Sequence, residues 1–204
     1  MAKGADFERR FCKELSLWWS DRKQDDLFWR SSMSGGRSTV RHKTGKATAG
    51  HSGDICATAE ISMPLTNLIT FELKSGYNKT ANAHSLLDFK AVKKSGRTGQ
   101  KMYEAWIEQA ILAQERAGTP YWMLIHRRDG GIPFCFMPSE LYIDLCMYCP
   151  GELFHPLPDP FFTLKKTIRF SDKSERKLSI IGMKWCHFLF HVDPRDIRIL
   201  KEKR

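Results

Sequence analysis

The stretch "TFELKSG", residues 70–76, places two charged side chains in a segment that otherwise has the composition of a buried β-strand. Successive side chains of a strand point to opposite faces, so Glu72 and Lys74 share one face about 7 Å apart. Phe71 and Leu73 point the other way, into a core. The sequence therefore predicts a carboxylate and an ammonium side by side on a strand that is otherwise apolar.

A second acidic residue is expected to reach this pair. Asp54 lies near the start of residues 53–59, "GDICATA", which also have the composition of a strand. We predict that residues 63–67 form a turn and join 53–59 to a strand at 68–74 as an antiparallel hairpin, which brings Asp54 next to Glu72. The charged pair of 68–74 taken alone also fits an ordinary surface salt bridge.

The first helix, predicted at 5–22, carries a third acidic residue. At about 100° per residue, Glu8 falls inside the apolar face of this helix. That face is formed by Phe7, Phe11, Cys12, Leu15, Trp18 and Trp19. A buried carboxylate is costly unless it is paired or binds a metal. Glu8 therefore predicts either a buried ion pair with a basic residue of the sheet or an acidic group directed at Asp54 and Glu72.

The composition is that of a globular protein with a polyanionic partner. Of the 204 residues, 42% are hydrophobic, which is enough to bury a core, and the formal net charge is +10. Such a charge favours nucleic acid or an anionic membrane surface as partner. No apolar run approaches the roughly 18 residues of a spanning helix, and the charged start "MAKGADFERR" lacks the apolar stretch of a signal peptide. We therefore expect no membrane partner and a cytoplasmic location, or the host cytoplasm for a viral chain.

The cysteines raise the question of a metal site. The six are Cys12, Cys56, Cys135, Cys146, Cys149 and Cys186. Without a secretory signal we expect no disulfide framework. Cys146 and Cys149 form a CxxC pair, and His187 and His191 would suit zinc if they lay on a helix. The stretch "MKWCHFLFHV", residues 183–192, is rich in aromatic residues and predicts a strand, on which the two histidines lie about 13 Å apart. We therefore expect buried thiols rather than a zinc site.

The remaining segments alternate between strands and helices. Strands are predicted at 27–31, 121–127, 133–137 and within 161–192, and helices at 82–89, 101–117 and 138–147. Residues 150–160 are rich in proline, and 194–204 form a basic tail. This order predicts an α/β fold, a mixed β-sheet flanked by helices. We assign residues 1–140 to a core domain and 141–204 to a C-terminal β-rich extension of unknown role, packed on that core.

Carboxylates beside a lysine suit the hydrolysis of a phosphodiester. Asp and Glu oxygens are ligands of Mg²⁺, which can activate a water and neutralise the charge of the transition state. The ammonium of Lys74 can orient the water or stabilise the same charge. The glycine-rich stretches lack the strand-turn-helix context of a P-loop or a dinucleotide site.

The pattern "GDI" at 53–55 followed by "FELK" at 71–74 resembles the PD-(D/E)XK nuclease superfamily, with Gly53 where many members carry proline. Within that superfamily the chain most resembles archaeal-type Holliday-junction resolvases and their viral relatives. Three further stretches carry this likeness: "KGADFERRFCKEL" with Glu8, "FWRSSMSGG", and "EQAILAQERAGTPYWMLIHR". The resemblance covers about residues 3–140, and a long basic insert before Asp54 departs from the compact resolvases.

The resemblance implies a metal-dependent endodeoxyribonuclease with a restriction-endonuclease-like core. Asp54 and Glu72 match the principal ligands of Mg²⁺, for which Mn²⁺ would substitute, and the carbonyl of Leu73 is a further ligand. Glu8 matches the helix acid that helps to hold the metal, and Lys74 matches the catalytic lysine. The resolvase likeness also implies branched DNA as substrate and a homodimer, because two symmetric cuts need two sites.

Other residues are expected to contact DNA or to assist. Ser32 or Ser34 matches a serine that contacts the scissile phosphate. Gln114, on the apolar face of the second long helix, is either a polar helper at the site or a glutamine bonded to backbone. Basic residues expected on phosphates are Arg30, Arg37, Arg41, Lys43, Lys46, Lys90, Lys93, Lys94, Arg97 and Lys101.

Two alternative functions stay open from the sequence. One is a nuclease of the same superfamily that acts on linear, single-stranded or sequence-specific DNA. The other is a non-catalytic basic DNA-binding module whose acidic corner is structural.

Overall fold

The fold is known from a computed structural model that describes residues 3–31, 53–77, 94–148 and 162–204. Its centre is a five-stranded mixed sheet in the order β3-β4-β5-β7-β6. These strands are β3 (Ile69–Ser75), β4 (Tyr121–Arg127), β5 (Phe134–Pro138), β6 (Phe162–Arg169) and β7 (Glu175–Lys184). β3 pairs with β4 in parallel, and the other neighbours pair antiparallel. β3, the strand that carries the charged pair, therefore lies at an edge of the sheet.

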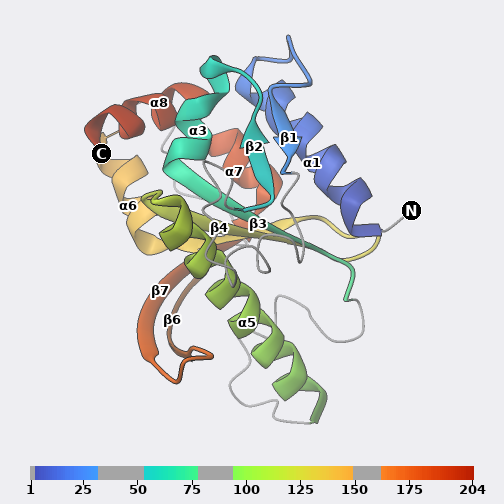
Figure 1. Cartoon of the computed structure of the whole chain (residues 1–204), viewed down its shortest axis with the longest axis vertical. Helices are drawn as coiled ribbons and strands as arrows, with labels where there is room; N and C mark the ends of the chain where they lie inside the picture. The colour runs from blue at the N-terminus through green and yellow to red at the C-terminus, as the bar shows by residue number, and fades with distance from the viewer. Residues whose placement is uncertain (1–2, 32–52, 78–93, 149–161) are drawn as a thin grey trace.

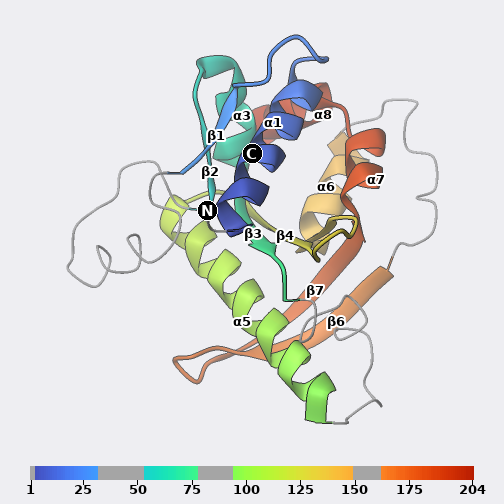
Figure 2. The same cartoon turned by 90° about the vertical axis from the view of Figure 1, so that its right-hand side faces the viewer.

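Helices cover both faces of this sheet (Figures 1 and 2). One face carries α5 (Lys94–Ala117), and the other carries α1 (Lys3–Trp19), α6 (Ser139–Tyr148), α7 (Trp185–His191) and α8 (Pro194–Lys203). A separate two-stranded ribbon, β1 (Phe28–Arg30) with β2 (Ile55–Ala57), packs beside α1. The α/β fold class predicted from the sequence, a mixed sheet flanked by helices, is confirmed and is consistent with a restriction-endonuclease-like core.

The two faces of the sheet bury two apolar clusters. On the α1 face, Phe71 and Leu73 join a cluster that also contains Phe11, Trp185 and Phe188. Trp185 stacks on Phe188, with ring centroids 5.3 Å apart, and lies 4.8 Å from the ring of Phe11. The alternation of side chains along β3 is therefore the predicted one, with its odd-numbered apolar residues in a core.

On the α5 face, a second cluster joins the long helix to the sheet. Tyr103 and Ile107 of α5 pack with Trp122 and Leu124 of β4 and with Phe136 of β5. The even-numbered side chains of β3 face this side, so the charged pair lies at the margin of an apolar layer. α5 begins earlier than the predicted helix at 101–117 and ends at Ala117, immediately before Gly118 at φ 67°.

The predicted hairpin between 53–59 and 68–74 is wrong. Residues 60–62 form a short 3-10 helix, η1 (Glu60–Ser62), and the predicted turn at 63–67 is part of a helix, α3 (Met63–Leu68). This helical connection lets β2 pair with β1, whereas β3 takes β4 as its parallel partner. Local sequence favoured a turn around Pro64, but proline is also well tolerated in the first turn of a helix, which is where α3 places it.

Most of the predicted strand at 183–192 is also wrong, because residues 185–191 form α7. His187 and His191 are therefore one helical turn apart, and the spacing argument against a shared ion does not hold. Even so, no group of three or more His, Cys, Asp or Glu side chains that could hold a metal occurs in the described ranges. Cys149 lies outside those ranges.

The five cysteines within the described ranges are free thiols. Cys12 and Cys135 are buried, as expected for apolar thiols, and burial raises the pKa of Cys12 to about 12. Cys146 and Cys186 are exposed, so the prediction of buried thiols is wrong for these two.

The residues after 140 share the sheet with the residues before it. β7 pairs with β5 on one side and with β6 on the other. The predicted basic tail forms α8, whose N-cap Asp193 accepts a hydrogen bond from the backbone N–H of Arg195. None of the described helices has the length and apolar character needed to cross a bilayer. The helix predicted at 82–89 and the proline-rich segment 150–160 lie outside the described residues.

Two phenylalanines of α7 test this packing. Phe188 is 1% exposed within the α1-face core, whereas Phe190 is 74% exposed. Phe188→Ala is expected to lower the free energy of unfolding by about 3–5 kcal/mol, because it leaves a cavity under Trp185. Phe190→Ala, the matched control, is expected to change it by less than about 0.5 kcal/mol. Urea denaturation measures both, and equal losses would contradict the placement of α7.

Candidate active site

Asp54 is fixed against the free edge of β3. Its backbone N–H donates to the carbonyl of Phe71 at 2.8 Å, and its Oδ2 accepts from the N–H of Leu73 at 2.7 Å. Its own carbonyl accepts from the N–H of Ser31 at 2.8 Å. Backbone N–H and C=O groups at a sheet edge need hydrogen-bond partners, and Asp54 alone provides a partner for Phe71 and for Leu73. Asp54 therefore reaches Glu72 by edge contacts rather than through the predicted hairpin.

Gly53 makes this close approach possible. Its φ is +98°, a region that L side chains rarely adopt. A Cβ at this position would meet the carbonyl oxygen of Phe71 at 2.8 Å and Cγ2 of Thr70 at 2.9 Å. Any other residue would push the loop away from β3, so the glycine places Asp54 at the edge.

Glu72, Lys74 and Gln109 form a hydrogen-bonded triangle on the α5 face. Lys74 Nζ lies 2.6 Å from Glu72 Oε1 and 3.0 Å from Gln109 Oε1. Gln109 Nε2 donates to the same Glu72 oxygen at 2.7 Å. The Glu72 side chain is 4% exposed and that of Lys74 16%, whereas Gln109 is exposed. The pair is therefore a buried one, not the surface salt bridge that the spacing alone also allowed, and it opens to solvent at Gln109.

Burial and mutual repulsion set the charge state of the two carboxylates. Desolvation is the main cause that raises the pKa of Asp54, to about 8, and the negative charge of Glu72 raises it further. Desolvation also raises the pKa of Glu72, although the ammonium of Lys74 opposes that shift. Two carboxylates that are buried together, at what we call the corner, favour a positive charge between them.

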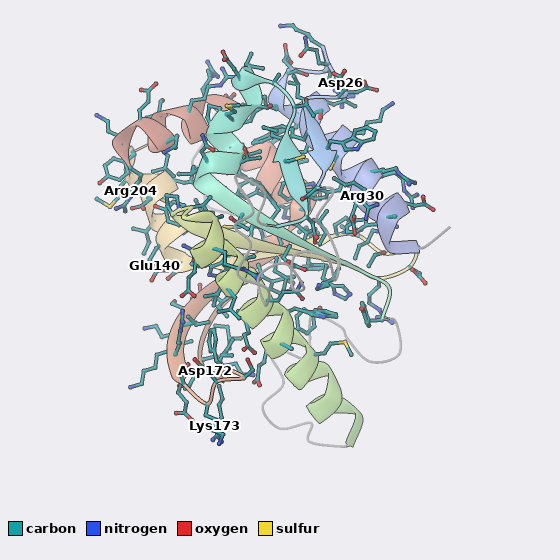
Figure 3. The ribbon with its side chains drawn as sticks, in the orientation of Figure 1. Asp26, Arg30, Glu140, Asp172, Lys173 and Arg204 are labelled. Carbon is teal, nitrogen blue, oxygen red and sulfur yellow. The ribbon has the colours of Figure 1, made fainter. Side chains whose placement is uncertain are left out.

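Glu8 forms the ion pair that the sequence left as one of two possibilities. Nε of Arg30, on β1, lies 2.6 Å from Oε2 of Glu8, and Figure 3 shows Arg30 where β1 meets α1. Glu8 is also close enough to raise the pKa of both Asp54 and Glu72. It therefore lies beside the corner with its charge opposed by Arg30, a residue predicted to contact DNA.

The predicted helper Gln114 is not at this corner. Its side-chain amide donates to the carbonyl of Thr119 at the end of α5, the backbone contact that the sequence had left open. Gln109, which the sequence reasoning missed, takes the place beside Glu72. Gln109 lies between Trp106 and Ala110, at the border of the apolar face of α5, and that border position is the sequence signal that could have found it.

Most of the predicted DNA contacts lie outside the described residues. Lys94, Arg97 and Lys101 fall in the N-terminal part of α5, where the backbone alone is described. The residues that lie wholly outside the described ranges are Ser32, Ser34, Arg37, Arg41, Lys43, Lys46, Lys90 and Lys93.

The donor set at the corner fits a divalent cation that prefers oxygen. Mg²⁺ is usually held by one or two carboxylates together with waters and substrate phosphates, so Asp54 and Glu72 suffice without a third acid. The N–H and C=O of one strand residue point to the same edge, so the carbonyl of Leu73 faces the free edge where Asp54 is bound. Burial raises the pKa of both carboxyls although Lys74 opposes the shift, and a bound divalent cation would favour their charged forms.

Comparison with known families gives the same superfamily. A family model described as "Phage putative PDDEXK endonuclease" matches residues 1–184. The chain belongs to this family. The PDDEXK endonuclease match runs from α1 to the end of β7, so it includes the whole corner and extends beyond the 3–140 of the sequence resemblance. Family membership supports a nuclease that acts on DNA. No curated protein and no solved structure matches the chain.

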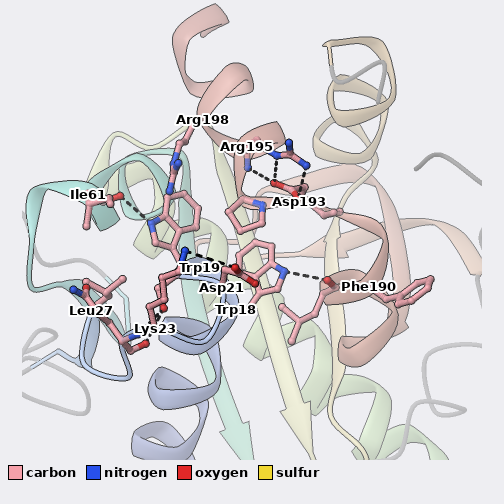
Figure 4. A pocket seen from close by; sticks show the side chains of 15 residues that line it. Trp18, Trp19, Asp21, Lys23, Leu27, Ile61, Phe190, Asp193, Arg195 and Arg198 are labelled. Atoms are coloured by element: carbon pink, nitrogen blue, oxygen red, sulfur yellow. Dashed lines mark hydrogen bonds and ion pairs between the residues drawn. The ribbon is translucent and has the colours of Figure 1, made fainter. Parts of the chain in front are cut away.

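A cavity of about 730 Å³ lies at the other end of α1 (Figure 4). Its walls include Trp18 and Trp19, whose indole N–H groups donate to the carbonyls of Leu189 and Ile61. Asp54, Glu72, Lys74 and Gln109, which make up the corner, are not among the residues that line this cavity. The PDDEXK corner and this cavity are therefore separate features of the molecule.

The raised pKa of Asp54 has a consequence for stability. Between pH 3.8, the ordinary pKa of the side chain, and about 8, the folded state keeps a proton that the unfolded state has released. The free energy of unfolding therefore falls as the pH rises through this window. In EDTA at pH 8, Asp54→Asn is expected to be more stable than the wild type by about 1–2 kcal/mol, as found when strained functional groups are removed.

Thermal denaturation of both proteins from pH 4 to pH 8 measures this difference. Asp26→Asn is the matched control, because Asp26 is exposed and its backbone carbonyl makes its contact with Thr58. It is expected to follow the wild type at every pH. If Asp54→Asn also follows the wild type, Asp54 is not desolvated at this corner.

Proposed function

We propose that this chain is a metal-dependent DNA endonuclease that hydrolyses phosphodiester bonds in branched DNA and acts as a homodimer. The observation that carries the proposal is the buried pair Asp54 and Glu72, with Lys74 bonded to Glu72 at 2.6 Å, at the free edge of β3. Membership in the PDDEXK endonuclease family supports the nuclease, and the resolvase likeness of the sequence supports branched DNA and two copies.

Asp54 and Glu72, with the carbonyl of Leu73, would hold the cation. When bound, a divalent ion supplies an activated water and neutralises charge on the phosphate. The two carboxylates are fixed before any substrate arrives, Asp54 by the N–H of Leu73 and Glu72 by Lys74 and Gln109. Little reorganisation is then needed at the moment of reaction, which is the condition under which electrostatic stabilisation is most effective.

Lys74 provides the positive charge for the phosphate. Its ammonium has three N–H groups, and Glu72 and Gln109 accept two of them. The third can donate to a phosphate oxygen or to the attacking water. Gln109 is exposed and donates to Glu72, so it closes the solvent side of the triangle and holds the carboxylate in place. Glu8 and Arg30 sit beside the corner, where Arg30 offsets the charge of Glu8.

Cleavage assays test the proposal. The wild type is expected to cut four-way junction DNA in Mg²⁺ or Mn²⁺. It is expected to cut duplex and single-stranded DNA more slowly. Asp54→Ala and Lys74→Ala are expected to lose at least about 10²–10³-fold in kcat, because each removes a group that stabilises the transition state. Both are expected to retain DNA binding.

Lys23→Ala is the matched control, because Lys23 is exposed and lies near the other end of α1. Its kcat is expected to equal that of the wild type. DNA binding without cleavage by the wild type would favour the non-catalytic module. Cleavage that ignores DNA structure would contradict branched DNA as the substrate while leaving the nuclease intact.

Substitution of two glutamines of α5 tests whether Gln109 acts at the corner while Gln114 has only a structural role. Gln109→Ala removes one partner of Glu72 and is expected to lower kcat about tenfold with little change in KM. Gln114→Ala removes a bond to the carbonyl of Thr119 and is expected to cost about 1 kcal/mol of stability with kcat unchanged. Steady-state kinetics and thermal denaturation of both variants measure this. Equal kcat losses would contradict the assignment of Gln109.

A further inference from the structure

Four ring-bearing side chains meet where β3 ends, just beyond Lys74. Tyr77 lies edge-on to Trp106, with ring centroids 4.9 Å apart. Trp106 lies 5.1 Å from Tyr103 and 5.0 Å from His126. Trp106 and Tyr103 come from α5, and His126 is the parallel partner of Lys74 on β4. We call this set the Tyr77 platform.

Two hydrogen bonds fix the platform to the end of β3. The hydroxyl of Tyr103 lies 2.7 Å from Nδ1 of His126, and Nε2 of His126 lies 3.2 Å from the carbonyl oxygen of Gly76. Burial lowers the pKa of His126, so the ring is neutral and has one N–H. A carbonyl can only accept, so Nε2–H donates to Gly76 and the Tyr103 hydroxyl donates to Nδ1. Gly76 is thereby held in one position.

The platform presents one ring to solvent. Trp106, Tyr103 and His126 are 6%, 0% and 3% exposed, whereas Tyr77 is 47% exposed. Tyr77 also has φ 60°, directly after Gly76 at φ 92°. A bulky residue in this left-handed region is uncommon, and such strain persists only where the surroundings impose it. The fold therefore holds an aromatic ring outward at an unfavourable backbone angle.

Position and charge point to the substrate of the neighbouring corner. Tyr77 follows Lys74 by three residues, so the two Cα atoms lie at most about 10 Å apart. The N–H of Gly76 donates to the carbonyl of Arg127 at 2.9 Å, so the end of β4 lies alongside. Arg128 is close enough for its charge to act on both Tyr103 and His126. Positive charge and an exposed ring occur together where proteins bind single-stranded nucleic acid.

We infer that Tyr77 is a substrate-positioning residue that stacks on an unpaired nucleobase next to the phosphate that is cut. Bases inside a continuous duplex are covered on both faces, so this contact needs a branch point, a flap or a single strand. The platform thus selects DNA with an unstacked base. The inference rests on the proposed nuclease function and names the feature of the substrate that this site recognises.

Three substitutions separate the ring from the backbone strain. Tyr77→Asn removes the ring, and asparagine accepts a left-handed φ better than most residues. Tyr77→Gly does the same with no side chain and replaces the Asn variant if that protein folds poorly. Tyr77→Phe retains the ring and is the conservative rescue. Because strain is relieved or unchanged, the melting temperature of each variant is expected to lie within a few degrees of that of the wild type.

Kinetics give the first readout. On DNA with an unpaired base beside the cut, Tyr77→Asn is expected to raise KM about tenfold or more with kcat close to that of the wild type, because a stacking contact is lost. On continuous duplex, its KM is expected to be unchanged. Tyr77→Phe is expected to match the wild type on both substrates. A wild-type KM for Tyr77→Asn, or equal losses on both substrates, overturns the inference.

Fluorescence of 2-aminopurine, placed at the unpaired nucleotide, gives a readout without cleavage. In EDTA the wild type and Tyr77→Phe are expected to quench it on binding, and Tyr77→Asn is expected to leave it bright. Quenching by all three proteins overturns the stacking contact. If the wild type cuts no DNA, the proposed function fails, and the fluorescence comparison still decides whether Tyr77 stacks on a base.

Discussion

Two carboxylates, Asp54 and Glu72, are buried together at the free edge of one strand, and most of the local structure exists to hold them there. Each is almost fully removed from water, at 7% and 3% exposure, so each would prefer to be neutral or beside a cation. The only full positive charge bonded to either is that of Lys74, among the described residues. The corner is therefore a place where the fold tolerates unfavourable electrostatics, which is typical of functional sites.

Three structural features hold the residues of this corner in place: apolar packing, a glycine and hydrogen bonds at the sheet edge. The apolar clusters on both faces of the sheet fix β3, since Phe71 and Leu73 are packed under α1. Gly53 lets the preceding loop touch the strand, where a Cβ would meet backbone at 2.8 Å. Asp54 then satisfies edge groups that would otherwise be unpaired. A sheet edge that could recruit another strand is used instead to position an acid.

The sequence predicted which side chains meet at the corner better than it predicted the strand topology. Alternation along residues 70–76 correctly divided the charged from the apolar side chains, because that period is a local property of a strand. The parallel pairing of β3 with β4 was missed, since strand partners depend on packing across the whole chain. α7 was missed because its aromatic residues favour strands, although its buried Trp185 and Phe188 have helical spacing.

The position of the glutamine helper shows the same limit. A helical wheel gives the angle of a side chain around α5, and both Gln109 and Gln114 lie near its apolar face. It does not give the depth at which the helix sits along the sheet, and that depth decides which glutamine meets Glu72. The sequence left two possibilities for Glu8, and it forms the ion pair with Arg30 while remaining close to both buried carboxylates.

The central claim is that Asp54 and Glu72 form the binding site of a divalent cation. Anomalous diffraction from crystals soaked in Mn²⁺ measures this directly, because the ion is located without reference to activity. A single anomalous peak within about 2.0–2.5 Å of oxygen atoms of both carboxylates is the expected result. Mn²⁺ bound elsewhere, with Lys74 still paired to Glu72 and no peak at the corner, would contradict the claim.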